Sequence, residues 1–562
     1  MLGTGSRKSK LPRNSHYVLS FICISSLLAY YFVFFPSHRD FNNAGQRLDR
    51  YLSDFSSFTE VSDFSKTSAL KLQSISFSRN ISRNDFHGWL REQLDISLYH
   101  MFDNICEAET SSVFGNCTPG VVFASPSRSE PDYFYHWIRD GAITINTLIN
   151  TNIDVDRERT LKTISNYINA SLDLQHKSNP SGPADDPLFR NLGEPKYHVD
   201  NSPFEQVWGR PQNDGPPLRA IALLNFLTQL KDEVEREEFS WIFDGVISLD
   251  LKFILQNWHI ATFDLWEEVC AYHFFTSMVQ LKALVEGRKH LLGVKASGIS
   301  LSEANIVLLK DIESGIEKIE SFIKDANSGF IDHEKGYIVE TPSILDERSG
   351  LDIAVIMAST LTHDELVNIS SSETFIFDVD DPLILNHFNE LIERMGVLYP
   401  INHNRLGTNM GVAIGRYPED VYDGIDISEG NPWFISTLTS AELIFKLINK
   451  MYYDEKPLLV DPVKNKFLNR VFEFNRLSSS PILIPYNTLA YNQTLYSIFK
   501  YGDSFLSKVN EHVTNEGSMS EQFNKYHGLN QGASDLTWSY GTFCSALRWR
   551  GIVDRLLHPD TP

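Results

Sequence analysis

Helical periodicity is the feature that most constrains the fold of this chain. Apolar residues recur at three- and four-residue spacings along most of residues 84–557, whereas the alternating pattern of strands is scarce. No period of about 20–50 residues repeats with recognisable identity, which disfavours a simple solenoid. We therefore predict one large all-α domain at residues 84–562. Its helices are expected at residues 86–105, 142–150, 157–174, 218–232, 243–258, 273–292, 302–326, 350–361, 382–398, 436–453, 466–474, 491–513 and 533–557.

The loops between these helices are long, polar and rich in Gly, Pro, Asn and Asp. Binding residues concentrate on such loops when a rigid scaffold carries them. The 37 Phe, 22 Tyr and 9 Trp suit either a large core or stacking against sugar rings. The net charge of −22 argues against a nucleic-acid partner, because phosphate binding needs a basic patch and none lies beyond the first fifteen residues.

The five cysteines are too few for a disulfide scaffold and lack the spacing of a metal site. Only Cys106 and Cys117 are close enough in sequence to suggest a local bridge. No cluster of ligand residues supports metal catalysis, so we expect neither a metal nor a cofactor.

An uncharged apolar segment at residues 17–35 follows four basic residues. At ~1.5 Å per residue this segment nearly crosses a ~30 Å hydrocarbon core, and the basic flank keeps the preceding end cytoplasmic. It ends without the small residues of a cleavage site. We predict a cytoplasmic tail at residues 1–16, a membrane-spanning signal anchor at 17–35 and a single-pass type II protein of the secretory pathway. A cleaved signal peptide stays open as the alternative and would give a secreted, vacuolar or wall-associated protein.

Residues 36–83 are rich in Ser, Asp and Phe and lack a sustained helical period. We interpret them as a stem or packing arm between the anchor and the helical domain. Entry into the secretory pathway would expose five sequons to glycosylation, at Asn80, Asn116, Asn169, Asn368 and Asn492.

Residues 261–269 place three carboxylates and two aromatic rings within the length of two helical turns. A glycosidase needs one carboxylic acid of raised pKa to protonate the leaving oxygen, and crowding Asp264, Glu267 and Glu268 disfavours full ionisation of the set. A solvated helix face is the alternative interpretation of this stretch. A second carboxylate must come from elsewhere, and Glu521 in the loop at residues 516–523 is the candidate.

Four further loops combine aromatic rings with charged groups. At residues 131–140, four rings surround Arg139 and Asp140, which suits a sugar subsite or a core edge with a surface salt bridge. His136 in this segment is expected to be structural. The loop at residues 207–216 presents Trp208, with Arg210 as its structural pin. The loops at 415–420 and 430–434 add a ring and a charge each, and the five loops together favour a carbohydrate site.

In their amino-acid sequences and in their order along the chain, these stretches resemble the fungal glucoamylases of glycoside hydrolase family 15, especially the yeast forms. The resemblance is collinear over residues 84–557. Two departures are Thr262, where Gly is usual, and Cys270-Ala271, where a small pair such as Asn-Gly is common. The motifs that carry the resemblance are Pro131-Asp-Tyr-Phe-Tyr135, Trp137-Ile-Arg-Asp140, Trp208-Gly-Arg-Pro-Gln212, Phe263-Asp-Leu-Trp-Glu-Glu-Val269, Gly415-Arg-Tyr-Pro-Glu-Asp420, Gly430-Asn-Pro-Trp433, Ser520-Glu-Gln522 and Leu536-Thr-Trp-Ser-Tyr540.

The resemblance implies a six-fold α/α barrel with its active site in a pocket of loops at one end. It implies that Glu267 is the general acid, Glu521 the general base and Asp264 an acid that supports them. Glu268 matches a sugar ligand near the leaving-group side. The other pocket residues that it implies are Tyr133, Trp137, Arg139, Asp140, Trp208, Trp266, Arg416 and Trp433.

The implied activity is exo-acting, inverting hydrolysis of terminal α-1,4-linked glucose, and slowly of α-1,6-linked glucose, from starch, dextrins or glycogen. The product would be β-D-glucose, and the enzyme is expected to be a monomer. Two alternatives stay open: a related barrel glycosidase of another linkage preference, such as α-1,6 or trehalose, and a glycan-binding protein without catalysis. Retention of both Glu267 and Glu521 argues against the second alternative.

Overall fold

The computed structural model describes residues 85–107, 110–111, 115–231, 233–365, 375–461, 464–473 and 481–558. The predicted cytoplasmic tail, signal anchor and stem, together with Asn80 and Asn368, lie outside these residues. Among the helices that are described, none is both long and apolar enough to span a bilayer.

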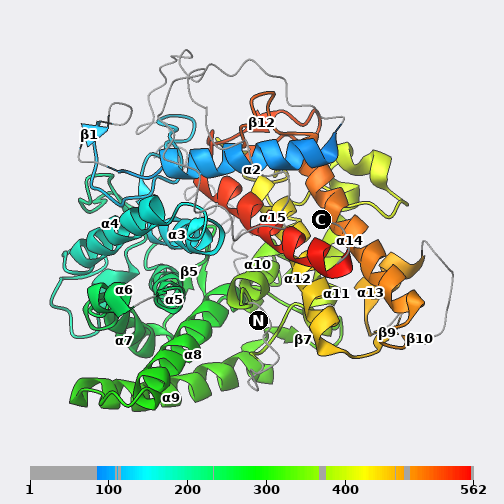
Figure 1. The fold of residues 1–562 in the computed structure, drawn as a ribbon. Helices are drawn as coiled ribbons and strands as arrows, with labels where there is room; N and C mark the ends of the chain where they lie inside the picture. The colour runs from blue at the N-terminus through cyan, green and yellow to red at the C-terminus, as the bar shows by residue number, and fades with distance from the viewer. Residues whose placement is uncertain are drawn as a thin grey trace, which may run out of the picture.

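The described chain is mostly helical, as predicted, and every segment expected to be helical contains a helix (Figure 1). The short α6 was not predicted, and a π-helical turn at Phe243–Ile247 leads into α7. The helices are α2 (Phe86–Asp103), α3 (Ile138–Asn152), α4 (Arg157–Gln175), α5 (Gly215–Thr228), α6 (Glu233–Glu238), α7 (Ser248–Asn257), α8 (Phe274–Ala296), α9 (Glu303–Lys324), α10 (Ile353–Thr362), α11 (Pro382–Leu398), α12 (Phe434–Asp454), α13 (Lys466–Glu473), α14 (Leu489–Asn510) and α15 (Thr537–Leu557).

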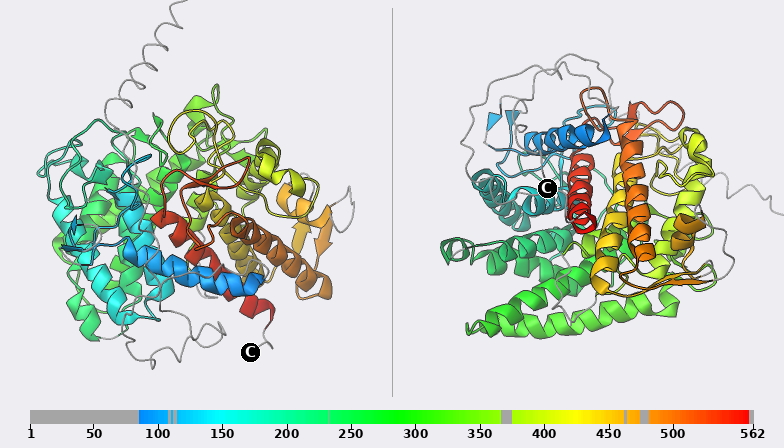
Figure 2. Two further views of the ribbon diagram at one scale, coloured as in Figure 1. Left: turned by 90° about the horizontal axis from the view of Figure 1, so that it is seen from above. Right: turned by 45° about the vertical axis from the view of Figure 1, so that its right-hand side comes forward.

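Within the described residues, six helices contact one another in a closed cycle: α3, α5, α8, α10, α12 and α15, with α15 returning to α3. A second helix packs on the outside of each: α4 on α3, α7 on α5, α9 on α8, α11 on α10, α14 on α12 and α2 on α15. Figure 2 shows the α8–α9 pair side by side and α2 packed across α15. Two concentric rings of six are the arrangement that a six-fold α/α barrel requires.

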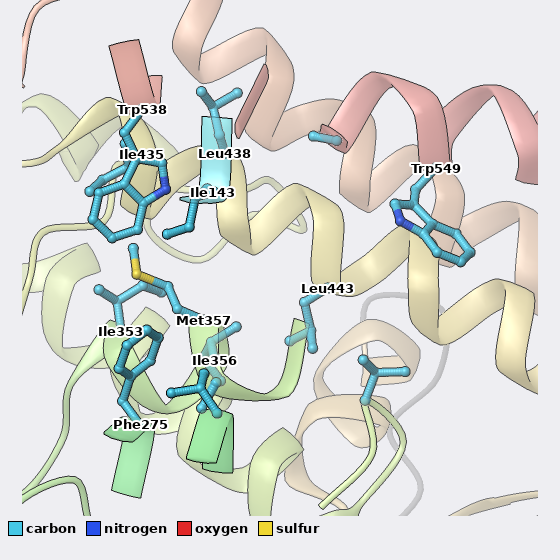
Figure 3. Packing of buried hydrophobic residues seen from close by; sticks show 14 of the residues in the cluster. Ile143, Phe275, Ile353, Ile356, Met357, Ile435, Leu438, Leu443, Trp538 and Trp549 are labelled. Carbon is cyan, nitrogen blue, oxygen red and sulfur yellow. The ribbon is translucent and has the colours of Figure 1, made fainter. Parts of the chain in front are cut away.

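The sequence of each helix fits its ring. The inner helix α10 is buried at nearly every position, from Ile353 to Thr360, as expected for a helix surrounded by others. The outer helix α9 buries only one stripe, which includes Ile312, Ile319 and Ile323. Apolar side chains from the inner helices fill the centre of the ring (Figure 3), among them Ile143, Phe275, Met357, Leu438 and Trp538.

The described strands are short and occur only as two-stranded pairs. Three of these pairs contain or adjoin predicted site residues: β3 contains Trp137 and leads into α3, the turn between β5 and β6 carries Glu267 and Glu268, and Glu521 directly precedes β11. The antiparallel pairs are β1 (Thr110–Ser111) with β2 (Gly115–Asn116), β3 (His136–Trp137) with β4 (Lys196–Tyr197), β5 (Thr262–Phe263) with β6 (Cys270–Ala271), β7 (Ile331–Asp332) with β8 (Tyr337–Ile338), β9 (Leu458–Val460) with β10 (Ile482–Ile484), and β11 (Gln522–Phe523) with β12 (Asn530–Gln531).

Candidate active site

The acidic stretch at residues 261–269 is a hairpin, so the helix-face interpretation is wrong. Strand β5 pairs with β6, and Glu267 adopts a left-handed φ of 67° at the turn between them. The buried Asp264 carboxylate accepts the backbone N–H groups of Glu268 at 2.7 Å and Val269 at 2.8 Å. Asp264 therefore holds the turn that presents the two glutamates.

The Glu267 carboxylate lies among donors from two other loops. Its Oε1 accepts Trp137 Nε1 at 2.6 Å and Gln212 Nε2 at 2.9 Å. Its Oε2 accepts Trp208 Nε1 at 2.9 Å, and Arg139 Nη2 lies 3.7 Å from Oε1. Three neutral N–H donors fix the orientation of this carboxyl group, and its side chain keeps 18% exposure.

The Glu521 carboxylate is buried in the loop before α15. Its Oε1 accepts the Tyr133 hydroxyl at 2.9 Å, and its Oε2 accepts the Tyr422 hydroxyl at 3.3 Å. Burial raises the pKa of Glu521 to about 8, although the Tyr133 hydrogen bond and the charge of Arg416 act in the opposite direction. Gly532, with a φ of 75°, lies directly against Oε2.

The Glu268 carboxylate is bound mainly by cationic side chains. Its Oε1 pairs with Arg416 Nη2 at 2.8 Å, while Oε2 accepts Tyr417 Oη at 2.5 Å and Arg348 Nη2 at 2.8 Å. Burial favours the neutral acid, yet Arg416, Tyr417 and Arg348 together lower the pKa of Glu268. Arg416 also forms two hydrogen bonds with Asp420, at 2.6 and 2.9 Å.

Arg139 and Asp140 are buried at the start of α3, so the interpretation as a surface salt bridge is wrong. Arg139 Nη1 donates to Gln212 at 2.9 Å and to Asp214 at 3.0 Å, and Arg139 Nε lies 3.7 Å from Asp140. Burial raises the pKa of Asp140 to about 6, against the effect of Arg139. This network connects Glu267 to polar groups that suit sugar hydroxyls.

Aromatic rings surround both glutamates. On one side the Trp137 ring contacts Tyr133 and Trp208, with centroids 5.4 and 6.2 Å away. On the other, Trp433 contacts Trp266 and Tyr422, with centroids 5.6 and 6.2 Å away. The structure thus brings all the predicted site residues into one connected cluster.

The two departures from the family pattern face each other in the hairpin, because Thr262 pairs with Ala271 and Phe263 with Cys270. Thr262 Oγ1 accepts the backbone N–H of Asn213 at 2.8 Å and donates to the Pro211 carbonyl at 2.9 Å. Thr262 therefore ties the acid-bearing hairpin to the loop before α5. Cys270 is an exposed free thiol.

Several contacts were not predicted from the sequence. Gln212 lay within a quoted motif but was not assigned a role, and Tyr422 follows one motif as an isolated ring. Lys196 gave no local signal, because only the β3–β4 pairing brings it opposite Trp137. Arg210 pairs with Glu194 at 2.8 Å, as its role as a pin requires. The described residues contain no group of three or more His, Cys, Asp or Glu arranged for a metal ion.

Comparisons with known proteins agree with this arrangement. The sequence model for glycosyl hydrolases family 15 matches residues 95–548. The intracellular, sporulation-specific glucoamylase of Saccharomyces cerevisiae is 38% identical over 485 residues, which cover 83% of this chain and 84% of that protein. A glucoamylase of Saccharomycopsis fibuligera is 36% identical over 497 residues, which cover 85% of this chain and 92% of that protein. A solved glucoamylase structure from Saccharomycopsis fibuligera superposes with a TM-score of 0.76 and 34% identity over 85% of this chain and 98% of that chain.

Proposed function

We propose a reaction for this chain from one premise: it belongs to glycosyl hydrolase family 15. Membership confirms the resemblance predicted from its motifs. Its activity is that of a glucoamylase, the release of glucose from α-glucans. In detail, the enzyme removes terminal α-1,4-linked glucose, and slowly α-1,6-linked glucose, from non-reducing ends of starch, dextrins or glycogen, and releases β-D-glucose.

The observation that carries this proposal is that one short segment binds both glutamates, each through a different side chain. Tyr133 binds Glu521 and Trp137 binds Glu267, and their ring centroids are 5.4 Å apart. The inverting mechanism proposed here calls for a spacing of ~6.5–9.5 Å between the two carboxyl groups, which leaves room for the attacking water molecule. A retaining mechanism needs the closer spacing of ~5–5.5 Å.

The reaction then proceeds in one displacement. Glu267 donates its proton to the glycosidic oxygen as the bond from the anomeric carbon to that oxygen breaks. Glu521 takes a proton from a water molecule whose oxygen bonds to the anomeric carbon from the opposite face. Burial raises the pKa of Glu521 to about 8, and the Tyr133 hydrogen bond and the charge of Arg416 oppose that rise by favouring the carboxylate form that this step needs. Exchange of both protons with solvent restores the enzyme.

The surrounding residues supply binding and orientation. Arg139 and Asp140 grip the hydroxyl groups of the terminal glucose, and the rings of Trp137, Trp208 and Trp433 stack against sugar faces. Glu268, ionised beside Arg416, accepts hydroxyl groups on the leaving-group side. Because the polar network of Arg139 is buried, the terminal sugar meets a closed end, which explains attack at chain ends.

The test is the anomer released from maltotriose, followed by proton NMR with the purified full-length protein. We expect β-glucose first, and losses of at least about 10²-fold in kcat for both Glu267→Gln and Glu521→Gln. Initial release of α-glucose, or full activity in either variant, would contradict the mechanism. Comparison of kcat/KM for maltose, isomaltose and trehalose separates this function from a barrel glycosidase of another linkage preference.

We also propose that the enzyme is a monomer anchored in a secretory membrane by residues 17–35. The Cys106–Cys117 disulfide, which was predicted and is present, suits an oxidising compartment. The sequon residues Asn116, Asn169 and Asn492 are exposed. We expect a mass shift on endoglycosidase treatment and retention in membranes after alkaline carbonate extraction. A soluble protein whose N-terminus begins beyond residue 35 would indicate a cleaved signal peptide instead.

A further inference from the structure

Lys196 lies in a cage of four aromatic rings beside the proposed proton donor. Its Nζ lies 3.7 Å from the ring centroid of Trp208 and 4.0 Å from that of Tyr135. The centroids of Phe204 and Trp137 are 4.3 and 4.4 Å away. An ammonium ion over an aromatic face is attracted by the negative charge of the ring face, most strongly for tryptophan.

The cage substitutes for an ion pair. Lys196 is 2% exposed, and in the described part of the chain no carboxylate lies within 4.0 Å of its ammonium group. Burial lowers the pKa of Lys196 to about 7, while the charges of Glu267 and Asp132 act to raise it. Burial of a lysine ammonium group costs free energy unless its charge interacts with other groups.

The cage is built from the same rings that hold Glu267. Trp137 Nε1 donates to one oxygen of that carboxyl group and Trp208 Nε1 donates to the other. The two indoles contact each other, and Phe204 packs edge-on against Trp208 with a centroid distance of 5.6 Å. The β3–β4 register fixes Lys196 opposite Trp137.

We propose that Lys196 is a positioning residue for proton donation: it locks the indoles of Trp137 and Trp208 in the orientation that aims the Glu267 carboxyl group. This inference rests on the proposed function. Each ring that the ammonium ion contacts loses rotational freedom, and a desolvated cation–π contact is worth enough to hold it.

Lys196→Met tests the proposal, because methionine fills the cage without a charge. The measurement is kcat for two substrates, maltotriose and α-D-glucosyl fluoride. Maltotriose needs protonation of its leaving oxygen, whereas fluoride leaves with little proton assistance. We expect Lys196→Met to lower kcat for maltotriose about 10–100-fold and to lower kcat for the fluoride less than about 3-fold. The ratio of kcat for maltotriose to kcat for the fluoride is also measured in Glu267→Gln, which gives the largest change in this ratio that loss of proton donation can cause.

Phe204→Leu is a second, milder variant, since Phe204 forms one wall of the cage and its ring lies against Trp208. Phe204→Leu should lower the ratio of kcat for maltotriose to kcat for the fluoride, as Lys196→Met does, but by a smaller factor. Lys446→Met is the matched control. Lys446 is also buried, with its Nζ 5.1 Å from the Trp549 ring centroid, but it forms ion pairs with Asp364 and with Glu442, which lies one turn earlier on α12. This control should lower the thermal midpoint and leave the ratio unchanged.

Equal losses on both substrates in Lys196→Met would overturn the proposal and indicate a structural role. A rise in KM for maltotriose at unchanged kcat would overturn it in favour of direct sugar binding. The proposal also fails if Lys446→Met shifts the ratio as much as Lys196→Met does. Failure of the unsubstituted enzyme to cleave maltotriose would instead refute the proposed function, so the two failures are distinguishable.

Discussion

Replacement of Gly532 by alanine should displace the proposed base without changing any polar group. Gly532 has a φ of 75°, and an added Cβ would stand 2.3 Å from Glu521 Oε2. Ordinary van der Waals contact begins at 3.4 Å, so the carboxylate must withdraw by about 1 Å. Glu521 is fully buried and held by Tyr133, so the movement reaches the atom that activates water.

The size of the effect follows from this displacement. A misplacement of ~1 Å costs about 10²-fold in rate, so we expect kcat for maltotriose to fall by about that factor in Gly532→Ala. KM should change little, because the binding groups of Arg139 and Asp140 belong to α3 and not to the loop that carries Gly532. The left-handed backbone should also cost about 1–2 kcal/mol in the free energy of unfolding, measured with urea.

Gly407→Ala is the matched control for backbone strain. Gly407 has a φ of 69° with nothing within 4 Å of an added Cβ, so it carries the strain without the clash. Its free energy of unfolding should fall by a similar amount while kcat stays unchanged. Wild-type kcat in Gly532→Ala, or an equal loss of kcat in Gly407→Ala, would refute the reasoning.

Three other outcomes are expected. Tyr133→Phe removes a hydrogen bond that lowers the pKa of Glu521, so the acidic limb of kcat/KM against pH should move to higher pH by about one unit; an unmoved limb contradicts this. Asp95 is buried, its carboxyl oxygens have no hydrogen-bond partner within the described residues, and burial raises its pKa from 3.8 to about 9. The folded state therefore loses stability as pH rises from about 4 to 9, and Asp95→Asn should raise the thermal midpoint at pH 8 but not at pH 4; equal effects at both pH values count against it. Loss of the Cys106–Cys117 bridge, which closes a short loop, should lower the free energy of unfolding by about 2–3 kcal/mol. The measurement is urea unfolding, and an unchanged urea midpoint would contradict this prediction.

The helices were predictable because amphipathic spacing is a local property, and α11 begins and ends at the predicted residues, 382 and 398. The closed cycle of inner helices was supplied by family resemblance, since no local pattern states which helix contacts which. The hairpin at residues 261–269 was missed for a physical reason. Its geometry depends on the buried Asp264 carboxylate binding two backbone N–H groups, and an aspartate at that spacing also suits an exposed helix.

The electrostatic environment of the three clustered acids was even less predictable, because it comes entirely from other loops. Crowding suggested that the set would resist ionisation. The pKa of Asp264 is indeed raised, by burial first and also by the charge of Glu268, whereas Arg416, Tyr417 and Arg348 lower the pKa of Glu268 against the effect of burial. The left-handed φ of Glu267 turns the chain so that adjacent glutamates meet different partners. Glu267 accepts hydrogen bonds from neutral indole and amide groups, with Arg139 3.7 Å from one oxygen, whereas Glu268 accepts hydrogen bonds directly from Arg416 and Arg348.

This separation explains how a proton donor can stand next to an arginine-rich subsite. An arginine in direct contact favours the ionised form of a carboxyl group, which cannot protonate a leaving oxygen. Glu268 and Asp420 accept hydrogen bonds from Nε and Nη2 of Arg416, while the turn directs Glu267 toward Trp137, Trp208 and Gln212. The positive φ at Glu267 therefore has a structural consequence: it gives two consecutive carboxyl groups different hydrogen-bond partners. The motif Asp-Leu-Trp-Glu-Glu works through this backbone geometry, with Asp264 fixing the turn, Glu267 donating and Glu268 binding.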